Sequence, residues 1–139
     1  MVKTQGKFVY AVEMPIRWYD MDAFGHVNNS IYLSYFEQAR INWWMSITPP
    51  DTAFDLIGPV VINAHCTFLK ALTYPDTLVI KLYVGPPGRS SYECFYEIYT
   101  HKHHDTLCAY GSTKVVWVDR KLEQSIPLPT YITKHLPSE

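Results

Sequence analysis

Three features are scarce in this chain of 139 residues, and each scarcity excludes a class of protein. The first is charge of one sign, because 12 Lys and Arg against 13 Asp and Glu leave a net charge of −1. A nucleic-acid groove needs a basic stripe, so we expect no nucleic-acid partner. The second is hydrophobic length: no run approaches the ~20 apolar residues of a membrane span, and the N-terminal segment lacks the apolar core of a signal peptide. We therefore expect a cytoplasmic protein with no membrane partner.

Cysteine is the third scarce feature. The chain has only Cys66, Cys94 and Cys108, which cannot all pair with one another, and it has no CxxC motif. All three lie in strand-like patterns, so we predict reduced thiols in the protein core.

The pattern of apolar residues predicts an α+β fold in one domain over 1–139. Runs rich in β-forming residues, several with apolar and polar residues in alternation, are typical of strands. These runs cover 7–18, 60–68, 77–84, 90–100 and 106–118. Pro15 near the end of the first run indicates an edge strand or a strand end.

One long helix is predicted between the first two strands. Ile31, Tyr35, Ala39 and Trp43 recur every fourth residue, which makes a wide apolar stripe at helical spacing. We expect the helix to end before Pro49. One helix cannot cover a five-stranded sheet on both faces, so we predict that a meander of the last four strands joins the first in an antiparallel sheet curled around the helix. Another subunit would bury the remaining apolar surface.

The most informative stretch is "RWYDMDAFGHVNNSIYLSYFEQAR" at 17–40. Two aspartates, a glycine, a histidine and two asparagines lie directly before the helix. This stretch resembles the signature of hot-dog-fold acyl-CoA thioesterases of the 4-hydroxybenzoyl-CoA thioesterase type. The signature is met at Arg17, Asp20, Asp22, Gly25, His26, Val27, Asn28, Asn29, Tyr32, Tyr35, Glu37, Ala39 and Arg40. A weaker likeness continues to about residue 129.

The resemblance implies a hot-dog fold, in which a five- or six-stranded antiparallel sheet wraps around one long helix. It also implies a homodimer or a homotetramer built as a dimer of dimers, with sites at the dimer interface. Asp22 is then the catalytic carboxylate, and the backbone amide of Asn29 points at the thioester oxygen. Coenzyme A enters only as part of the substrate, so no cofactor is expected.

Elementary chemistry is consistent with these roles. Thioester hydrolysis needs a carboxylate that attacks the carbonyl or activates water. A helix N-terminus offers unpaired N–H groups to the developing oxyanion, and Gly25 allows a close backbone approach or a positive φ. Taken alone, a loop carboxylate such as Asp22 more often caps a helix or closes an Asx-turn.

The neighbouring polar residues keep two interpretations each. Asp20 is expected to hold the loop through hydrogen bonds to backbone or to Arg17. His26 either orients the substrate or Asp22, or is a hydrogen-bonded structural histidine. Asp20, Asp22 and His26 carry metal-binding atoms, but their spacing fits no established site, so we predict no metal.

Three further positions are candidates for substrate contacts, and one for catalysis. Lys70, Arg89 and Ser90 lie beside turns and are suited to the phosphates of coenzyme A, although solvated surface residues are the alternative. Glu37 is a secondary catalytic candidate, because some hot-dog enzymes carry a carboxylate on this helix. Its spacing from Arg40 also suits a surface ion pair.

Two other functions remain open at this point. A hot-dog dehydratase acting on an acyl thioester usually pairs Asp and His at another spacing, with a short Asp-x-Asn-Pro segment that this chain lacks. A non-catalytic acyl-CoA-binding module on the same fold is the second alternative. A carboxylate at position 22 facing the thioester would have no use in such a module.

Overall fold

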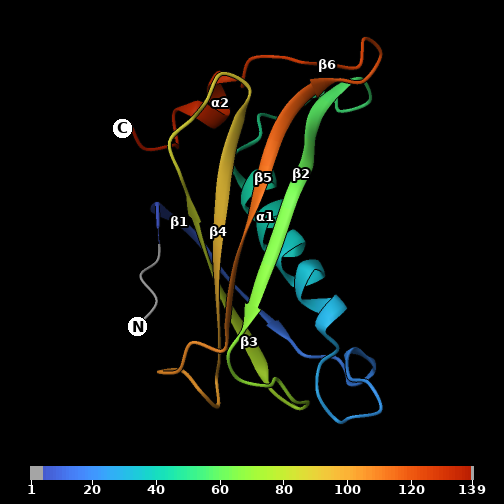
Figure 1. Ribbon diagram of the computed structural model, residues 1–139. Helices are drawn as coiled ribbons and strands as arrows, with labels where there is room; N and C mark the ends of the chain where they lie inside the picture. The colour runs from blue at the N-terminus through green and yellow to red at the C-terminus, as the bar shows by residue number, and fades with distance from the viewer. Residues whose placement is uncertain (1–4, 139) are drawn as a thin grey trace.

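The computed structural model describes residues 5–138, and its elements follow the predicted order (Figure 1). The strands are β1 (Lys7–Pro15), β2 (Ile57–Phe68), β3 (Thr77–Val84), β4 (Ser91–Thr100), β5 (Ala109–Asp119) and β6 (Gln124–Ser125). The helices are α1 (Tyr32–Ile47) and α2 (Thr130–Thr133), with 3-10 turns η1 (Trp18–Asp20) and η2 (Asn29–Ile31). As predicted, α1 ends before Pro49.

The strands form one antiparallel sheet in the order β1-β3-β4-β5-β2, with β6 added to the end of β5. The predicted meander is therefore correct for β3, β4 and β5 but wrong for β2, which pairs with β5 from Ile57↔Asp119 to Phe68↔Ala109. The place beside β3 is taken by β1, whose Pro15 pairs with Thr77 at the end of an edge strand. An alternating pattern specifies which face of a strand is buried, but it does not specify the neighbouring strand.

Helix α1 lies against the concave face of the sheet, and the core is the layer between them (Figure 1). The predicted stripe is buried at Tyr35, Ala39 and Trp43. Phe36 stacks on Tyr96 of β4 with ring centroids 4.3 Å apart. A Cβ at Gly111 of β5 would lie 2.6 Å from the Phe36 ring, so only glycine allows the helix to approach this closely. One long helix held in a curled antiparallel sheet of six strands is the hot-dog fold.

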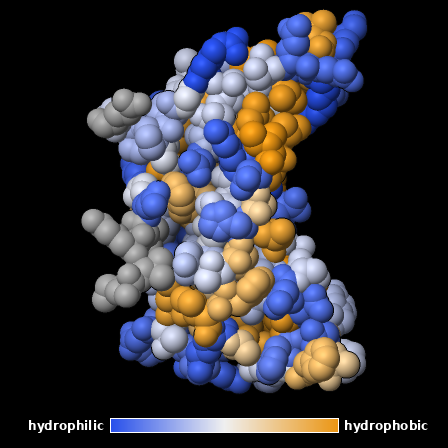
Figure 2. Space-filling model, viewed as in Figure 1, coloured by the Kyte–Doolittle hydropathy of each residue, from blue (hydrophilic) through white to orange (hydrophobic). Residues whose placement is uncertain are grey.

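The two edges of the sheet differ in chemistry. Edge β1 carries Lys7, Glu13, Pro15 and an irregularity near Tyr10, all of which discourage pairing with another strand. Edge β2 and its flanks expose large apolar side chains, and Figure 2 shows hydrophobic residues gathered along this edge. They are Leu56, Ile57, Val61, Ile62, Phe68 and Leu69. No helix within residues 5–138 is long and apolar enough to cross a membrane.

Candidate active site

The loop between β1 and α1 folds back on itself and is held by backbone hydrogen bonds. Met21 and Val27 form an isolated antiparallel bridge. The Asp22 N–H donates to the His26 carbonyl at 3.0 Å, and the Gly25 N–H donates to the Asp22 carbonyl at 3.1 Å. Gly25 has φ of +82°, which a side chain at this position would disfavour. The turn thus sets Asp22 and His26 at the same end of the molecule as the start of α1.

Asp20 fastens this loop to the core. Its side chain is 1% exposed, and its Oδ2 accepts hydrogen bonds from the Tyr35 hydroxyl at 2.8 Å and from the Arg17 N–H at 3.0 Å. The Arg17 guanidinium lies 3.2 Å from Oδ1 without hydrogen-bond geometry, so this contact is a charge–charge attraction. The Asp20 carbonyl also accepts the Asn28 N–H at 3.0 Å. The expected anchoring by backbone and Arg17 is present, and Tyr35 adds to it.

Asp22 has different surroundings. Its Oδ1 accepts the Phe24 N–H at 2.9 Å, which closes an Asx-turn, and its Oδ2 accepts the side-chain amide of Asn28 at 3.0 Å. Asn28 in turn is the N-cap of η2, because its Oδ1 accepts the Ser30 N–H at 2.9 Å. These contacts hold the carboxylate next to the first turn of the helix.

A pocket of about 740 Å³ opens at this point. It is lined by the loop, the helix start and the segment after β2: Asp22, Phe24, His26, Val27, Asn28, Asn29, Tyr32, Phe68, Leu69, Lys70 and Ala71. Among residues 5–138, no acceptor forms a hydrogen bond with the Asn29 N–H. The Asn28 side chain accepts from the Ser30 N–H instead. The residues that line the pocket therefore include a carboxylate, a cation and, in Asn29, a residue at a helix start whose N–H has no acceptor among residues 5–138.

Lys70 is the cation of the pocket, and its backbone is firmly held. The N–H groups of Leu69 and Lys70 both donate to the Cys108 carbonyl, each at 2.9 Å. This shared acceptor ties the segment after β2 to the strand β5 side of the sheet. Lys70 thus lies in the pocket on ordered backbone.

The comparison with known proteins decides the family. Residues 16–136 match the family model of the thioesterase-like superfamily. The chain belongs to this thioesterase-like superfamily. A provisionally assigned esterase from Aquifex aeolicus is 30% identical over 114 residues, which is 81% of this chain and 87% of the relative.

Solved structures agree with this assignment. A provisionally assigned thioesterase from Pseudomonas aeruginosa superposes with a TM-score of 0.86 at 34% identity, covering 92% of this chain and 98% of that one. A provisionally assigned acyl-CoA thioesterase from Xanthomonas campestris gives a TM-score of 0.73 at 33% identity, covering 81% and 95%. The chain is thus a thioester hydrolase with the hot-dog fold of its family.

The thioesterase pocket collects some of the site residues expected from sequence and not others. Asp22, His26, Asn29 and Lys70 line it, and Gly25 forms its adjoining turn. Glu37 does not line it, because it lies over a separate cavity beside β1 and is 3.8 Å from the Arg40 guanidinium. This is the surface pair that its spacing suggested.

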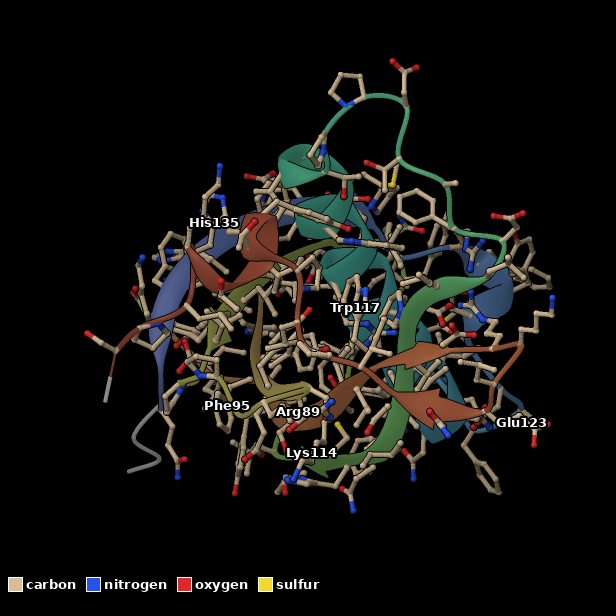
Figure 3. All side chains as sticks on the ribbon, turned by 90° about the horizontal axis from the view of Figure 1, so that it is seen from above. Arg89, Phe95, Lys114, Trp117, Glu123 and His135 are labelled. Atoms are coloured by element: carbon tan, nitrogen blue, oxygen red, sulfur yellow. The ribbon has the colours of Figure 1, made fainter. Side chains whose placement is uncertain are left out.

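Arg89 and Ser90 lie at the opposite end of the folded molecule from Asp22. They follow β3, whose eight residues span roughly 25 Å. The Asp22 loop is attached at the opposite end of that strand, where the Ile16 N–H donates to the Asp76 carbonyl. Figure 3 looks down on the end that carries Arg89, with Lys114 labelled near it.

The cysteines of this thioesterase lie as expected. Cys94 and Cys108 are buried and Cys66 is half-buried. Burial raises the pKa of Cys66 to about 11 and that of Cys94 to about 12, so both remain thiols near neutral pH. Among residues 5–138, no three His, Cys, Asp or Glu side chains converge to hold a metal ion.

Two hydrogen bonds of the candidate site were not predicted from the sequence: Tyr35 to Asp20 and Asn28 to Asp22. From the sequence, Tyr35 is placed in the apolar stripe and in the family signature, and Asn28 in that signature, without a predicted hydrogen-bond partner for either side chain. The available signal for Tyr35 was its hydroxyl, since a buried tyrosine usually finds a hydrogen-bond partner. The sequence could not show that Phe68 and Leu69 line the pocket, because their position there depends on which end of β2 lies next to the loop.

Proposed function

We propose that the protein is an acyl-CoA thioesterase that releases a free carboxylic acid and coenzyme A. One observation supports the proposal: Asp22 and Asn29 line the same pocket at the start of α1, and the Asn29 N–H has no acceptor among residues 5–138. The acyl-CoA substrate class is taken from the provisional assignment of the Xanthomonas campestris relative. Coenzyme A enters as part of the substrate, and the proposal needs no cofactor and no metal.

In the proposed reaction, the thioester carbonyl lies against the Asn29 N–H. Asp22 removes a proton from water as the water oxygen bonds to the carbonyl carbon, or its own oxygen bonds to that carbon first. The carbonyl electron pair moves onto oxygen, where the amide stabilises it by about 3 kcal/mol. The C–S bond then breaks, and the coenzyme A sulfur leaves with the electron pair and takes up a proton. Along the nucleophilic route, water then hydrolyses the acyl–Asp22 anhydride to release the acid.

The remaining pocket residues are assigned to binding. Lys70 faces the pocket on ordered backbone and is suited to an anionic part of coenzyme A. His26 is exposed at the same rim and is assigned to orienting the substrate. Gly25 keeps the turn that presents Asp22.

We also propose that the active form is a homodimer paired through β2, from which a homotetramer would form as a dimer of dimers. The exposed apolar side chains along β2 support this, because a bare edge of that kind is otherwise a site of aggregation. Antiparallel pairing of two β2 strands turns one subunit end for end. Arg89 of the partner subunit and Ser90 of the partner subunit would then approach the end that holds Asp22.

The catalytic proposal is tested by thiol release from a panel of acyl-CoAs, followed with a thiol-reactive dye. Asp22→Asn should lower kcat by ~10²–10⁴ while the melting temperature changes little. Asp105→Asn is the matched control, since Asp105 is an exposed carboxylate in the β4–β5 hairpin. Hydrolysis by Asp22→Asn at the wild-type rate across the panel would remove Asp22 from the mechanism. No hydrolysis by the wild type, with acyl-CoA still bound, would favour the binding module.

The dimer proposal is tested by light scattering coupled to size exclusion. Ile62→Lys places a charge on the β2 edge and should give monomers with lower activity. Leu122→Lys is the control, because Leu122 is 61% exposed and Ile62 is 60% exposed, but Leu122 lies in the β5–β6 turn. A dimeric Ile62→Lys variant would contradict pairing through β2.

A further inference from the structure

The side-chain amide of Asn28 joins two parts of the site that the chemistry needs together. Its Nδ2 donates to Asp22 Oδ2 at 3.0 Å, while its Oδ1 accepts from the Ser30 N–H at 2.9 Å and from the Ser30 hydroxyl at 2.7 Å. One side chain therefore caps the turn that presents the Asn29 N–H and also contacts the proposed catalytic carboxylate.

The orientation of this amide follows from its partners. The Ser30 backbone N–H can only donate, so the atom facing it must be the Asn28 oxygen. The amide nitrogen then has to face Asp22. An ionised carboxylate has no proton to donate, so its oxygen can only accept a hydrogen bond. Reversing the amide would place oxygen against oxygen at Asp22 and nitrogen against the Ser30 N–H. The network permits one orientation only.

The backbone of Asn28 is equally constrained. Its N–H donates to the Asp20 carbonyl at 3.0 Å, and its carbonyl accepts the Ile31 N–H at 2.9 Å. Because Asp20 is itself buried and bonded to Tyr35, Asn28 is fixed to the core through its main chain. A rigid donor of this kind fixes the direction of the Asp22 carboxylate, whose other oxygen is held by the Phe24 N–H at 2.9 Å.

We infer that Asn28 is a positioning residue for the reaction. It keeps the Asp22 carboxylate turned toward the Asn29 N–H, so that the attacking oxygen and the oxyanion donor face one carbonyl from both sides. The inference rests on the role proposed for Asp22. A misplacement of a catalytic group by about 1 Å can cost on the order of 100-fold in rate. Asn28 acts through Asp22 and need not touch the substrate.

The decisive variant is Asn28→Asp. Aspartate is also a good N-cap, so the helix start is retained, but the N–H donor to Asp22 is replaced by a second carboxylate. We expect kcat to fall by roughly 10- to 100-fold with KM within about 3-fold. We also expect the acid limb of the kcat/KM profile to move up by about one pH unit, because two adjacent carboxylates resist joint ionisation. Other titratable side chains lining this pocket are His26, Tyr32 and Lys70.

Asn42→Asp is the matched control. It makes the same chemical change on α1, where Asn42 Oδ1 accepts the Gln38 side-chain amide at 2.7 Å and does not line the pocket. Its kinetics and pH profile should equal those of the wild type. If Asn28→Asp does not fold, Asn28→Ser serves instead, since serine keeps the cap without a charge. Asn28→Ser should show the loss of kcat without the pH shift.

A readout independent of turnover accompanies the kinetics. In NMR spectra the Asn28 side-chain NH₂ signals should shift as Asp22 is protonated, and this shift should be absent in Asp22→Asn. Wild-type kcat and pH profile in a folded Asn28 variant, or NH₂ signals that ignore the Asp22 titration, overturn the positioning role. If Asp22→Asn is inactive in the same series, only this inference has failed. If Asp22→Asn is fully active, the role proposed for Asp22 has failed as well.

Discussion

The two carboxylates of the loop before α1, Asp20 and Asp22, are separated by one residue and have opposite surroundings. Asp20 is 1% exposed and is held by Tyr35 and Arg17, whereas Asp22 is partly exposed at the wall of a pocket. The first is bonded to the protein from the core side, and the second faces open space. One short loop thus holds two carboxylates in different ways: Asp20 fastens the chain to the core, and Asp22 lies at the wall of the pocket, where the proposed reaction needs a carboxylate.

Asp20→Ala should lower the stability of the protein more than any other substitution in this loop. It leaves the buried Tyr35 hydroxyl and the Arg17 N–H without their acceptor, so we expect a loss of about 3 kcal/mol in the free energy of unfolding. Asp22→Ala should cost under about 1 kcal/mol, since its partners are near solvent. Urea titrations followed by tryptophan fluorescence measure both. Equal midpoints for the two variants would contradict the anchoring role of Asp20.

Tyr35→Phe tests the same anchor from the other side. Removing the hydroxyl takes one donor from the buried Asp20 carboxylate, and we expect a loss of about 1–2 kcal/mol in the free energy of unfolding. Tyr74→Phe is the control, because Tyr74 is exposed, and it should change stability by under about 0.5 kcal/mol. If the two variants unfold at the same urea concentration, the Tyr35–Asp20 hydrogen bond contributes nothing measurable.

The pH dependence of stability sharpens this prediction. Burial, and then the hydrogen bond to Asp20, raises the pKa of Tyr35 well above its usual range. Above pH ~10 the unfolded tyrosine ionises while the folded one stays neutral, so its contribution to stability is lost as the pH rises. The difference in unfolding free energy between wild type and Tyr35→Phe should therefore narrow by about 1.4 kcal/mol from pH 9 to pH 11. Urea titrations at both pH values measure it, and a constant difference would contradict the assignment.

Gly25→Ala should have a smaller effect on stability than Asp20→Ala and act only on the Asp22 side of the loop. The position has φ of +82°, and apart from the two chain neighbours no atom of residues 5–138 lies within 4 Å of an added Cβ, so the cost is conformational, at about 1 kcal/mol. Expressed as a free energy, the loss of kcat should exceed the loss in the free energy of unfolding, because this turn presents Asp22. Gly25→Asn is the matched variant and should lose less, since asparagine adopts positive φ more easily. Equal losses for alanine and asparagine would exclude backbone strain as the cause.

Local patterns were sufficient for much of the fold. The end of α1 before Pro49 follows from proline geometry, and the strands β3, β4 and β5 follow from composition and turn residues. The position of β2 could not be predicted, because pairing with β5 is a contact between residues far apart in sequence. For the same reason the sequence could not show that Lys70 lines the pocket, whereas Arg89 lies at the opposite end of the folded molecule.

The candidate site shows where a residue type has more than one use. The roles of Asp22 and Asn29 are predicted through a resemblance, since a loop carboxylate taken alone more often caps a helix or closes an Asx-turn, and asparagine at a helix start is most often a cap. Asp22 does close an Asx-turn with Phe24, so the structural use and the proposed chemical use coexist in one side chain. The Asn28–Asp22 contact depends on how tightly the turn at Gly25 folds, which spacing alone does not determine.

The Asn29 amide, which has no acceptor among residues 5–138, has a thermodynamic consequence. A ligand that binds only the folded protein couples occupancy of the pocket to folding, so a molecule whose oxygen accepts from the Asn29 N–H raises the midpoint of thermal unfolding by mass action. Free carboxylic acids carry an acceptor of the right kind. A thermal-shift screen of acids with different carbon skeletons would therefore rank acyl preference without any turnover, and the ranking should disappear when position 29 is proline.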